Sequence, residues 1–600
     1  FKASKEIRNS IVYATLIVIF VFLPLMALSG VEGRLFAPLG IAYMVSIGAS
    51  LVVSLTVTPA LCYYLLKDAK AVDHGESWVV RRLKFYDEKL LSWSLDYPKK
   101  ILLPVVMLLV LAAASLPFMG KGFLPPFNEG TLTVNLRLPP GASLSESNKV
   151  GLAAEAQLHE IPEVTSIARR SGRAEQDEHA EGVNNSDLEV SLKKSKRTHQ
   201  EILAEVRKKL ATLPGVALNI GQPISHRLDH MLSGVRAEIV IKIFGSELKT
   251  LRTKAEDLKN ELKGIPGLAD LQIEQLVNIP QVQILPDRTK ALMYGVNVNQ
   301  AVTYLETVLQ GREIAQVREG ERPVDVVLRL SENWRNKSDI LKNIMIPSGY
   351  GLIPVNLVSQ VEQTEGPNMI NRENQQRRLV LMANVSGRDL NSVVQDIQVK
   401  IKNVSLPTGY HIALEGQFKS QQEANQLIAV LGVFSLLFIF LLLYSHFKSP
   451  HLALVIMANI PMALIGSVAA LWITGQQLTV ASLVGFITLT GIASRNGILK
   501  VSHYLHLMKY ENEQFTREMV IRGSLERLTP VLMTALVAAL ALVPLILDGE
   551  APGKEILHPV AIVIFGGLLS STLLDSIVTP VIFWLLGKQR IERVLVDFES

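Results

Sequence analysis

Long apolar runs alternate with charged segments along this chain. A transmembrane helix needs about 20 mostly apolar residues, and eight stretches fit that requirement. They lie at about 11–29, 36–66, 101–119, 426–446, 452–474, 478–504, 529–547 and 556–587. The pattern predicts an α-helical membrane protein with eight spans, in which about 305 residues without such a run separate the third span from the fourth.

Lysine and arginine residues indicate the orientation of these spans, because cytoplasmic segments carry an excess of positive charge. Basic residues gather before the first span, at 67–100, at 509–527 and from 588 onward. If these four segments are cytoplasmic, the spans alternate without conflict and residues 120–425 lie outside. Residues 78–95 look amphipathic, which fits either a helix along the inner membrane surface or an ordinary soluble helix.

The first two spans and the last two spans resemble each other. Each pair has a proline late in its first helix, a proline at the start of the next, and a final Val-Thr-Pro. Pro559 lies 521 residues after Pro38, and Pro580 lies 521 residues after Pro59, so both pairs have the same spacing. We interpret this as a parallel repeat, although a coincidence of Thr-Pro motifs is the alternative. The repeat predicts twelve spans in all, with about 420 residues, four spans and another domain of about 300 residues preceding Phe1.

The segment between the third and fourth spans alternates between strand and helix patterns. A period-two pattern at 132–138 is followed by helical periodicity at 143–161, and similar units recur as far as residue 414. Repeated strand–helix–strand units are typical of ferredoxin-like α/β subdomains. Residues 278–363 carry small strands and helices of their own, which indicates an insertion.

Composition narrows the classes of function. A chain that is 48% apolar and 19% charged is neither disordered nor wholly embedded in lipid. The net charge of +5 is too small over 600 residues to argue for nucleic acid. A single cysteine, Cys62, excludes a disulfide framework and a Cys-based zinc site, and we expect it to be a buried small hydrophobe. The sequence has no P-loop, nucleophile elbow or HExxH motif, so an enzyme and an ATP-driven transporter are both disfavoured.

The span order and four local motifs carry a family resemblance. The motifs are GFLP with NEG at 122–130, HRLDHMLSGVR at 226–236, GRE at 311–313 and GIASRNG at 491–497. Together they resemble the heavy-metal efflux branch of the resistance–nodulation–division (RND) transporters. The resemblance implies an inner-membrane homotrimer with a periplasmic domain, in contact with lipid, a periplasmic adaptor protein and an outer-membrane channel. It also implies proton-driven export of a metal cation, without a further cofactor.

The same resemblance implies a division of the chain. Residues 1–67 would contain the transmembrane helices that end the first repeat, residues 68–98 would form a cytoplasmic amphipathic linker, and residues 99–121 would form a transmembrane helix. Outside the membrane, residues 122–221 would form one porter subdomain, residues 222–277 with 364–424 a second porter subdomain, and residues 278–363 a docking-type insertion. Residues 425–600 would contain the remaining spans and a cytoplasmic tail.

Ionisable residues inside spans are candidates for function, because lipid penalises an unpaired charge. Arg495 lies in the middle of a span, and the resemblance implies that it is the basic member of a proton relay whose acidic partners lie on the fourth span of the complete protein. Arg527 and Thr534 match the other relay positions of the family. A positive-inside anchor is the alternative for Arg527, and a hydrogen bond to its own helix is the alternative for Thr534. Asp575 also lies within a span, but contact with water or a neighbouring helix explains it, so we assign it no role.

Ligand chemistry favours a divalent metal. Thioethers select Cu(I) and Ag(I), whereas imidazole and carboxylate suit harder divalent ions. The copper and silver members use three methionines in the porter cleft, and by resemblance these positions map onto Asn135, Asn185 and His230, none of which is Met. With Asp187 on the strand face of Asn185 and Asp229 beside His230, we predict a site for Zn, Co, Ni or Cd.

Several alternatives remain open. Met231 lies one residue from a methionine position, so a local shift would allow Cu(I) or Ag(I). The run at 175–179 is either a further ligand group or a solvated charge run. A multidrug pump would need an aromatic pocket, and residues 120–425 contain only four Phe. A non-transporting RND-like export or receptor subunit is disfavoured by Arg495 and by the insertion.

Overall fold

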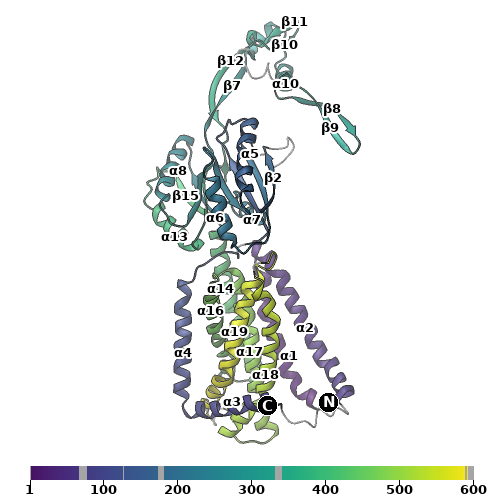
Figure 1. Cartoon of the computed structure of the whole chain (residues 1–600), viewed down its shortest axis with the longest axis vertical. Coiled ribbons are helices and arrows are strands. Elements are labelled where there is room, and N and C mark those ends of the chain that lie inside the picture. Colours follow the sequence, from purple (N-terminus) through teal and green to yellow (C-terminus); the bar gives the residue numbers. More distant parts are fainter. Residues whose placement is uncertain are drawn as a thin grey trace.

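The molecule consists of two stacked parts, a bundle of long helices and a domain of sheets and shorter helices at one end of it (Figure 1). This computed structural model describes residues 2–66, 77–125, 127–172, 182–331, 341–549, 551–587 and 591. The chain leaves the bundle after α4 and returns through α14, so the whole sheet domain, from β1 to β15, is one long excursion between two helices of the bundle.

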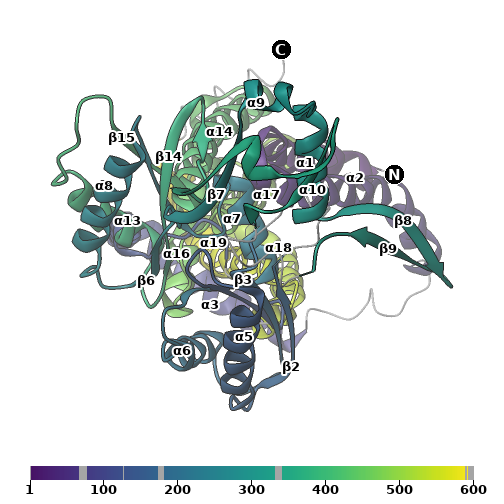
Figure 2. The same cartoon turned by 90° about the horizontal axis from the view of Figure 1, so that it is seen from above.

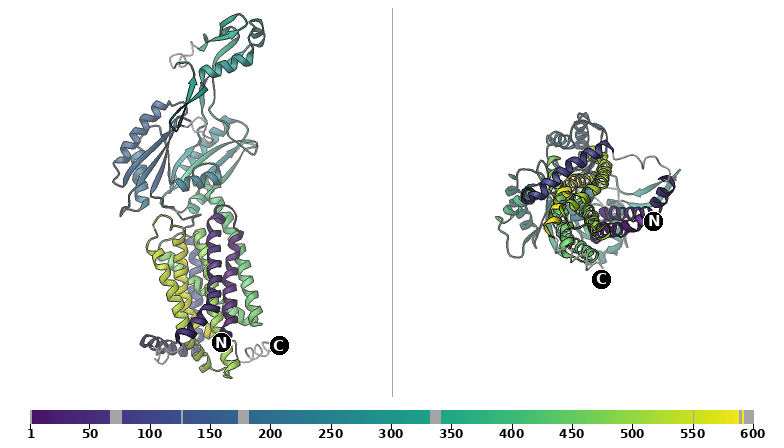
Figure 3. Two further views of the ribbon diagram at one scale, coloured as in Figure 1. Left: turned by 90° about the vertical axis from the view of Figure 1, so that its right-hand side faces the viewer. Right: turned by 90° about the horizontal axis from the view of Figure 1, so that it is seen from below.

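The bundle is built from both ends of the chain. Its helices are α1 (Lys2–Phe22) with η1 (Leu23–Ala27), α2 (Gly30–Leu66), α4 (Pro98–Ser115) with η3 (Leu116–Phe118), α14 (Gln417–Phe447), α15 (Pro450–Met457), α16 (Asn459–Ile473), α17 (Val480–Tyr510), α18 (Arg517–Leu547) and α19 (Leu557–Leu585). The helices run side by side along the long axis of the molecule (Figure 3).

Six segments of the described chain are long and apolar enough to cross a membrane. They are Gly30–Leu65, Pro98–Phe118, Gln417–Phe447, Pro450–Ile473, Arg517–Leu547 and Leu557–Leu585. Two of the eight expected spans are not in this set. The first is a shorter apolar helix, Ile11–Ala27, and the other is α17, which carries polar residues such as Arg495, Asn496 and Lys500 along its second half.

The position of α17 explains how it tolerates this polarity. It packs against α1, α16, α18 and α19, and most of its residues are buried. Its polar side chains therefore meet other helices rather than lipid, which removes the need for a continuous apolar surface. Hydropathy alone underestimates such a central helix.

The expectation that Cys62 is buried is wrong, because its thiol is exposed on α2. This helix lies at the edge of the bundle and packs mainly against α1 and η1 (Figure 2). Its other faces, including residues such as Val52, Leu61 and Tyr64, are therefore exposed within this chain.

Helix α3 (Trp78–Asp96) crosses the end of the bundle that lies away from the sheet domain (Figure 1). Its N-terminal cap is Ser77, whose side chain accepts a hydrogen bond from the Val80 amide. Leu91 and Leu95 are buried against the bundle, where α3 contacts α18 and α19. At its C-terminal end, Arg517 of α18 donates to Asp96 at 2.9 Å. The amphipathic segment is thus docked on the bundle.

The first sheet of the sheet domain is antiparallel, with the strand order β2-β3-β1-β4. Its elements are β1 (Thr131–Arg137), α5 (Leu144–His159), β2 (Val164–Ser171), β3 (Asn185–Leu192), α6 (His199–Leu210) and β4 (Ala217–Gly221). Leu132, Val134 and Leu188 belong to the core between this sheet and its two helices. Helix α7 (Pro223–Ser233) follows β4 and leads to the second sheet.

The second sheet has the order β13-β14-β5-β15, with β6 also paired to β14. Its elements are β5 (Ile239–Phe244), α8 (Leu248–Leu262), β6 (Leu268–Ile273), β13 (Arg372–Glu373), β14 (Gln376–Val385), α13 (Leu390–Ile401) and β15 (His411–Gly416). Gly416 joins β15 directly to α14 at a φ of 93°, where an added Cβ would lie 2.5 Å from the Glu238 carbonyl oxygen. Only glycine fits this junction between sheet and bundle.

A long two-stranded stalk carries a small head away from the bundle (Figures 1 and 3). Its strands are β7 (Asn278–Pro286) and β12 (Ser359–Pro367), paired antiparallel over their full length. The head contains α9 (Arg288–Met293), α10 (Val298–Leu309), β8 (Arg312–Glu319), β9 (Arg322–Leu328), β10 (Met345–Ser348), β11 (Gly351–Pro354) and η4 (Val355–Leu357). The β8–β9 hairpin projects sideways and is exposed throughout (Figure 2).

Candidate functional site

Arg495 lies half-buried in α17 and makes no hydrogen bond or ion pair with any residue that the structure describes. Gly491, one turn earlier on the same face, lies against α1, where an added Cβ would be 3.2 Å from Val18 Cα. The guanidinium therefore starts from the side of α17 that turns toward α1, and it lacks a counter-charge among the described residues.

The other two relay candidates lie on α18. Arg527 donates from Nη2 to His503 Nδ1 on α17 at 3.1 Å, and His503 Nε2 lies 2.7 Å from Glu526 Oε2. This order fits an imidazole that accepts at Nδ1 and donates at Nε2. Thr534 donates to the Val531 carbonyl of its own helix at 2.9 Å. No hydrogen bond or ion pair joins Arg495, Arg527 and Thr534 to one another within the described chain, so the three-residue relay stays a prediction.

A buried ion pair joins α17 to α19, and the sequence analysis did not find it. Lys500 Nζ lies 2.9 Å from Asp575 Oδ2 and donates to the Asp575 carbonyl oxygen at 2.7 Å. The side chains are 4% and 1% exposed. Asp575, for which the sequence alone gives no role, thus has a charged partner on a neighbouring helix. The sequence did contain a sign of this pair, because Lys500 is a second cation in the same apolar segment, about one and a half helical turns after Arg495.

The porter-cleft candidates begin with a polar group on the first sheet. Asn135 on β1 is opposite Asp187 on β3 in the strand register. Its Nδ2 donates to Asp187 Oδ1 at 2.6 Å and to Asn185 Oδ1 at 2.9 Å. Three of the five predicted metal-site residues, Asn135, Asn185 and Asp187, therefore lie together on one face of the sheet.

Asp187 is held as a carboxylate by two guanidinium groups as well. Arg236 Nη1 lies 3.1 Å from Asp187 Oδ2, and Arg170 Nη2 lies 3.4 Å from the same oxygen. Burial alone would raise the pKa of Asp187, but the hydrogen bond from Asn135 and the charge of Arg236 outweigh burial, so its pKa is lowered. A metal ion at this carboxylate has to compete with, or displace, these donors.

The other two predicted ligands, Asp229 and His230, are neighbours on α7 but point to different surroundings. His230 is exposed in the last turn of α7, whereas Asp229 is buried and accepts a hydrogen bond from Gln417 Nε2 on α14 at 2.8 Å. The five candidates thus occupy three places. No group of three or more His, Cys, Asp or Glu suited to a metal ion occurs among the described residues, and the run at 175–179 lies outside them. The metal site stays a prediction.

Burial raises the pKa of Asp229 from 3.8 to about 7, and the nearby Glu238 carboxylate adds to the effect. An acid whose folded-state pKa is raised favours folding most below pH 3.8 and progressively loses that contribution as the pH rises to about 7. Taken alone, Asp229 should lower the free energy of local opening of α7 by about 3 kcal/mol between about pH 5 and pH 8. Buried His226 on the same helix, whose pKa is lowered to about 4, acts in the opposite direction below about pH 6.5. Hydrogen exchange of α7 amides, corrected for intrinsic rates, measures this. Asp229→Asn, which keeps an acceptor for Gln417, should remove the fall that Asp229 causes and leave the rise that His226 causes; the same pH profile in wild type and variant would contradict this assignment.

His226, one turn before His230 on α7, is a residue that sequence reasoning missed. It is 5% exposed, and neither ring nitrogen has a hydrogen-bond partner among the described residues. Burial, helped by the charge of Arg236, lowers its pKa to about 4, so the imidazole is neutral. The i, i+4 spacing of the two histidines in HRLDH was the available signal.

Polar contacts continue from this region to the second sheet. Asn384 on β14 donates to Asn219 on β4 at 2.7 Å and to Asp270 at 2.9 Å. Asp270 is held in turn by Arg207 of α6, whose Nη2 is 3.1 Å away. The first sheet and its helix α6 are therefore joined to the second sheet by hydrogen bonds and an ion pair.

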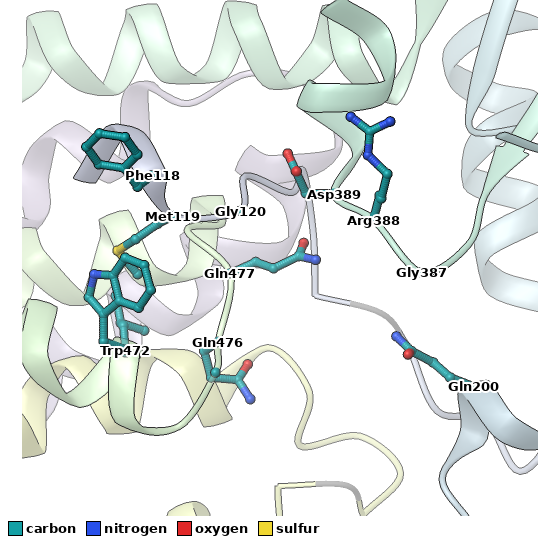
Figure 4. A pocket seen from close by; sticks show the side chains of 12 residues that line it. Phe118, Met119, Gly120, Gln200, Gly387, Arg388, Asp389, Trp472, Gln476 and Gln477 are labelled. Atoms are coloured by element: carbon teal, nitrogen blue, oxygen red, sulfur yellow. The ribbon is translucent and has the colours of Figure 1, made fainter. Parts of the chain in front are cut away.

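A cavity of about 330 Å³ lies where the bundle meets the sheet domain (Figure 4). Phe118, Met119 and Trp472 form one wall, at the ends of η3 and α16 (Figure 4). Asp389 lies across from them and caps α13 by accepting from the Ser392 amide at 3.1 Å. No predicted relay or metal residue lines this cavity within the described chain.

Comparison with known proteins matches this architecture to one family. Residues 1–587 match the AcrB/AcrD/AcrF family. The chain belongs to that family. It is 34% identical over 599 residues to the cobalt-zinc-cadmium resistance protein CzcA of Cupriavidus metallidurans, which covers 97% of this chain and 56% of CzcA. It is 31% identical over 593 residues to the nickel-cobalt-cadmium resistance protein NccA of Alcaligenes xylosoxydans xylosoxydans, covering 97% and 55%.

A crystal structure of a heavy metal efflux pump has the same fold, with a TM-score of 0.84 and 28% identity over 98% of this chain and 59% of that chain. The resemblance to heavy-metal RND transporters is confirmed, and the chain has the RND transporter fold of a membrane-embedded protein. It spans a little more than half the length of the curated relatives that it matches.

Proposed function

We propose that this chain is part of an RND pump that exports heavy-metal cations across the cell envelope in exchange for protons. The observation that carries the proposal is Arg495, a half-buried cation inside a central helix that has no counter-charge among the described residues. Such a charge is costly in a membrane, and the charged residues that occur there mark ion and proton pathways. A carboxylate supplied from outside this chain would pair with it, and proton binding there would release the pair.

We infer that α1 and α17 also span the membrane, which gives eight spans of the expected twelve. The support is their position beside the apolar helices, since both pack lengthwise in the same bundle. We likewise assign the sheet domain to ferredoxin-like subdomains. In the first sheet, the order β2-β3-β1-β4, with α5 before β2 and α6 before β4, supports that assignment.

The proposed substrate is a divalent ion of the Zn, Co, Ni or Cd group. The positions that would hold methionine in a Cu(I) or Ag(I) site are Asn135, Asn185 and His230, and an imidazole or carboxylate site suits divalent ions. The names of CzcA and NccA refer to cobalt, zinc, cadmium and nickel. Cu(I) or Ag(I) is the second candidate, because Met231 is 59% exposed beside His230 and offers a thioether.

The proposed setting is the inner membrane of a bacterium, in a homotrimer with a periplasmic adaptor and an outer-membrane channel. The stalk and head support this, because they extend away from the bundle beyond both sheets (Figure 3). The exposed β8–β9 hairpin is available there for contact with another chain.

Transport in vesicles tests the proposed function. In proteoliposomes holding the full-length pump, a pH gradient should drive Zn(II) or Co(II) movement, with proton movement in the opposite direction reported by an internal dye. Collapse of the gradient with an ionophore should stop the metal flux. Equal metal flux with and without the gradient would contradict proton coupling, and flux of Cu(I) without Zn(II) would favour the second candidate.

A further inference from the structure

The Lys500–Asp575 pair lies deep in the bundle and away from Arg495. Lys500 is twenty residues after the start of α17 and ten before its end at Tyr510. Asp575 is likewise ten residues before the end of α19 at Leu585. At 1.5 Å per residue, both charges lie about 15 Å above the ends of their helices, on the side that α3 covers. Arg495 is five residues earlier on α17, about 7.5 Å farther from that end.

Uncharged polar groups extend this pair sideways into α16. Thr579 Oγ1 lies 2.5 Å from Asp575 Oδ1 and 3.2 Å from Asn459 Oδ1. Asn459 and Thr579 are both fully buried, and Asn459 Nδ2 has no hydrogen-bond partner within the described residues. The ion pair thus belongs to a small polar site at the contact of α16, α17 and α19, and one donor of that site is unused.

A second carboxylate lies on α3, the helix that covers this end of the bundle. Asp87 is half-buried on α3, one turn before Leu91 on the face that packs against the bundle, and the charge of Lys500 acts on it without a hydrogen bond or ion pair between these two described residues. Burial raises the pKa of Asp87 to about 6 although Lys500 acts to lower it. The two carboxylates, Asp575 and Asp87, thus lie on different helices, and the charge of Lys500 acts on both.

Other charged groups lie on or beside α3, and one of them, Lys84, is a single turn before Asp87. Arg517 of α18 binds Asp96 and Ser92 at the C-terminal end of α3. Helix α19 contributes Asp575 itself, and α4 begins only beyond that end of α3. Arg81 and Lys84, on α3 itself, have contacts of their own.

Stability alone does not explain a buried ion pair. Desolvation of two charges offsets most of their attraction, and replacing such a pair by apolar side chains of similar size is often neutral or stabilising. Inside a membrane the cost of a charge is higher still, and charged residues there mark ion and proton pathways. Lys500 and Asp575 therefore need a functional explanation, and the relay proposed around Arg495 does not use them.

We propose that Asp575, Lys500 and Asp87 form a path that carries protons from the interior of the bundle to the face covered by α3. This proposal rests on the proposed function, proton-coupled export, and adds the route by which protons leave. When Asp575 takes up a proton, Lys500 passes one of its own protons to Asp87 through an intervening water and then accepts the proton from Asp575. Asp87 releases its proton to water, so one proton has crossed and each group regains its starting charge.

The test compares three variants of the full-length pump in proteoliposomes with an imposed pH gradient. The first combines Lys500→Met with Asp575→Leu, which removes the pair without leaving a buried charge unmatched. The second is Asp87→Asn. The third, Glu88→Gln, changes the exposed neighbour of Asp87 on α3 and serves as the control. Assembly state and melting temperature show that each variant is folded.

We expect proton and metal flux in the double variant to fall at least about tenfold, as for loss of a proton-transfer group, while metal binding is unchanged. Wild type and Glu88→Gln should lose flux as the pH on the α3 side falls below about 6, where Asp87 becomes protonated. The Asp87→Asn variant should show a low flux at every pH, without the further loss below about pH 6 that wild type shows. A purely structural role of Asp87 would not change the shape of this pH profile.

Two results would overturn the proposal, and they are independent of each other. One is wild-type flux in the folded double variant, and the other is an unchanged pH profile in Asp87→Asn. The second decides the matter if the double variant fails to fold, because Asp87 is not part of the buried pair. Absence of gradient-driven flux in the wild type itself would overturn the proposed function together with this path. If the wild type shows gradient-driven flux, but the double variant keeps that flux and Asp87→Asn keeps the wild-type pH profile, only the proposed path is wrong.

Discussion

Arg495→Ala should abolish proton-coupled metal export by the full-length pump and leave the protein folded and inserted. The guanidinium is half-buried in α17 and has no counter-charge among the described residues, so its removal breaks no ion pair within this chain. A relay that loses its cation can no longer respond to protonation of the facing carboxylate. We expect a fall in transport of about a hundredfold or more, measured as gradient-driven metal flux in proteoliposomes.

Two further variants sharpen this test. Arg495→Lys keeps the charge but loses the bidentate geometry, so partial flux is expected. Arg8→Ala, which removes an exposed cation from α1, should leave transport unchanged. If Arg495→Ala transports metal at the wild-type rate, Arg495 has only a structural role and the proposed coupling is wrong.

The combined replacement Asn135→Met, Asn185→Met and His230→Met should change the exported metal from a divalent ion to Cu(I) or Ag(I). Three thioethers replace two amides and one imidazole, and thioether ligands select the soft monovalent ions. Asp187 would lose its hydrogen bond from Asn135 but keep Arg236 and Arg170, so we expect the sheet to stay folded. The measurement is the ratio of Zn(II) to Ag(I) flux in the same vesicles.

Single substitutions separate the contributions to this site. His230→Ala should lower divalent flux at least about tenfold, since even loss of a group that supports a metal ligand has that effect. Met231→Ala is the matched control and should leave divalent flux unchanged. If wild type carries Ag(I) but not Zn(II), and Met231→Ala loses that activity, the divalent assignment is wrong.

Much of the local structure could be predicted from the sequence. The first strand was expected at 132–138 and lies at Thr131–Arg137, and the helix expected at 143–161 lies at Leu144–His159. These signals are local, because side-chain direction repeats every two residues in a strand and every 3.6 in a helix. The long apolar runs are local in the same way, which is why six of the eight expected spans meet the length and hydropathy requirements.

Several features were decided only when the helices and sheets packed together. Asp229 and His230 are adjacent in sequence, yet one is buried against α14 and the other is exposed, because neighbours on a helix point about 100° apart. Cys62 looked like a core residue by its type but lies on an exposed face of α2.

Lys500 and Asp575 show that the same limit applies inside the helix bundle: their pairing could not be predicted from the sequence. They are 75 residues apart, on helices with different neighbours in sequence, and only the contact of α17 with α19 brings their charges to 2.9 Å. Hydrophobic periodicity determines which residues form helices and strands, because it acts within one element. Which charge finds a partner depends on the rotation and depth of two separate elements, and that is determined by packing.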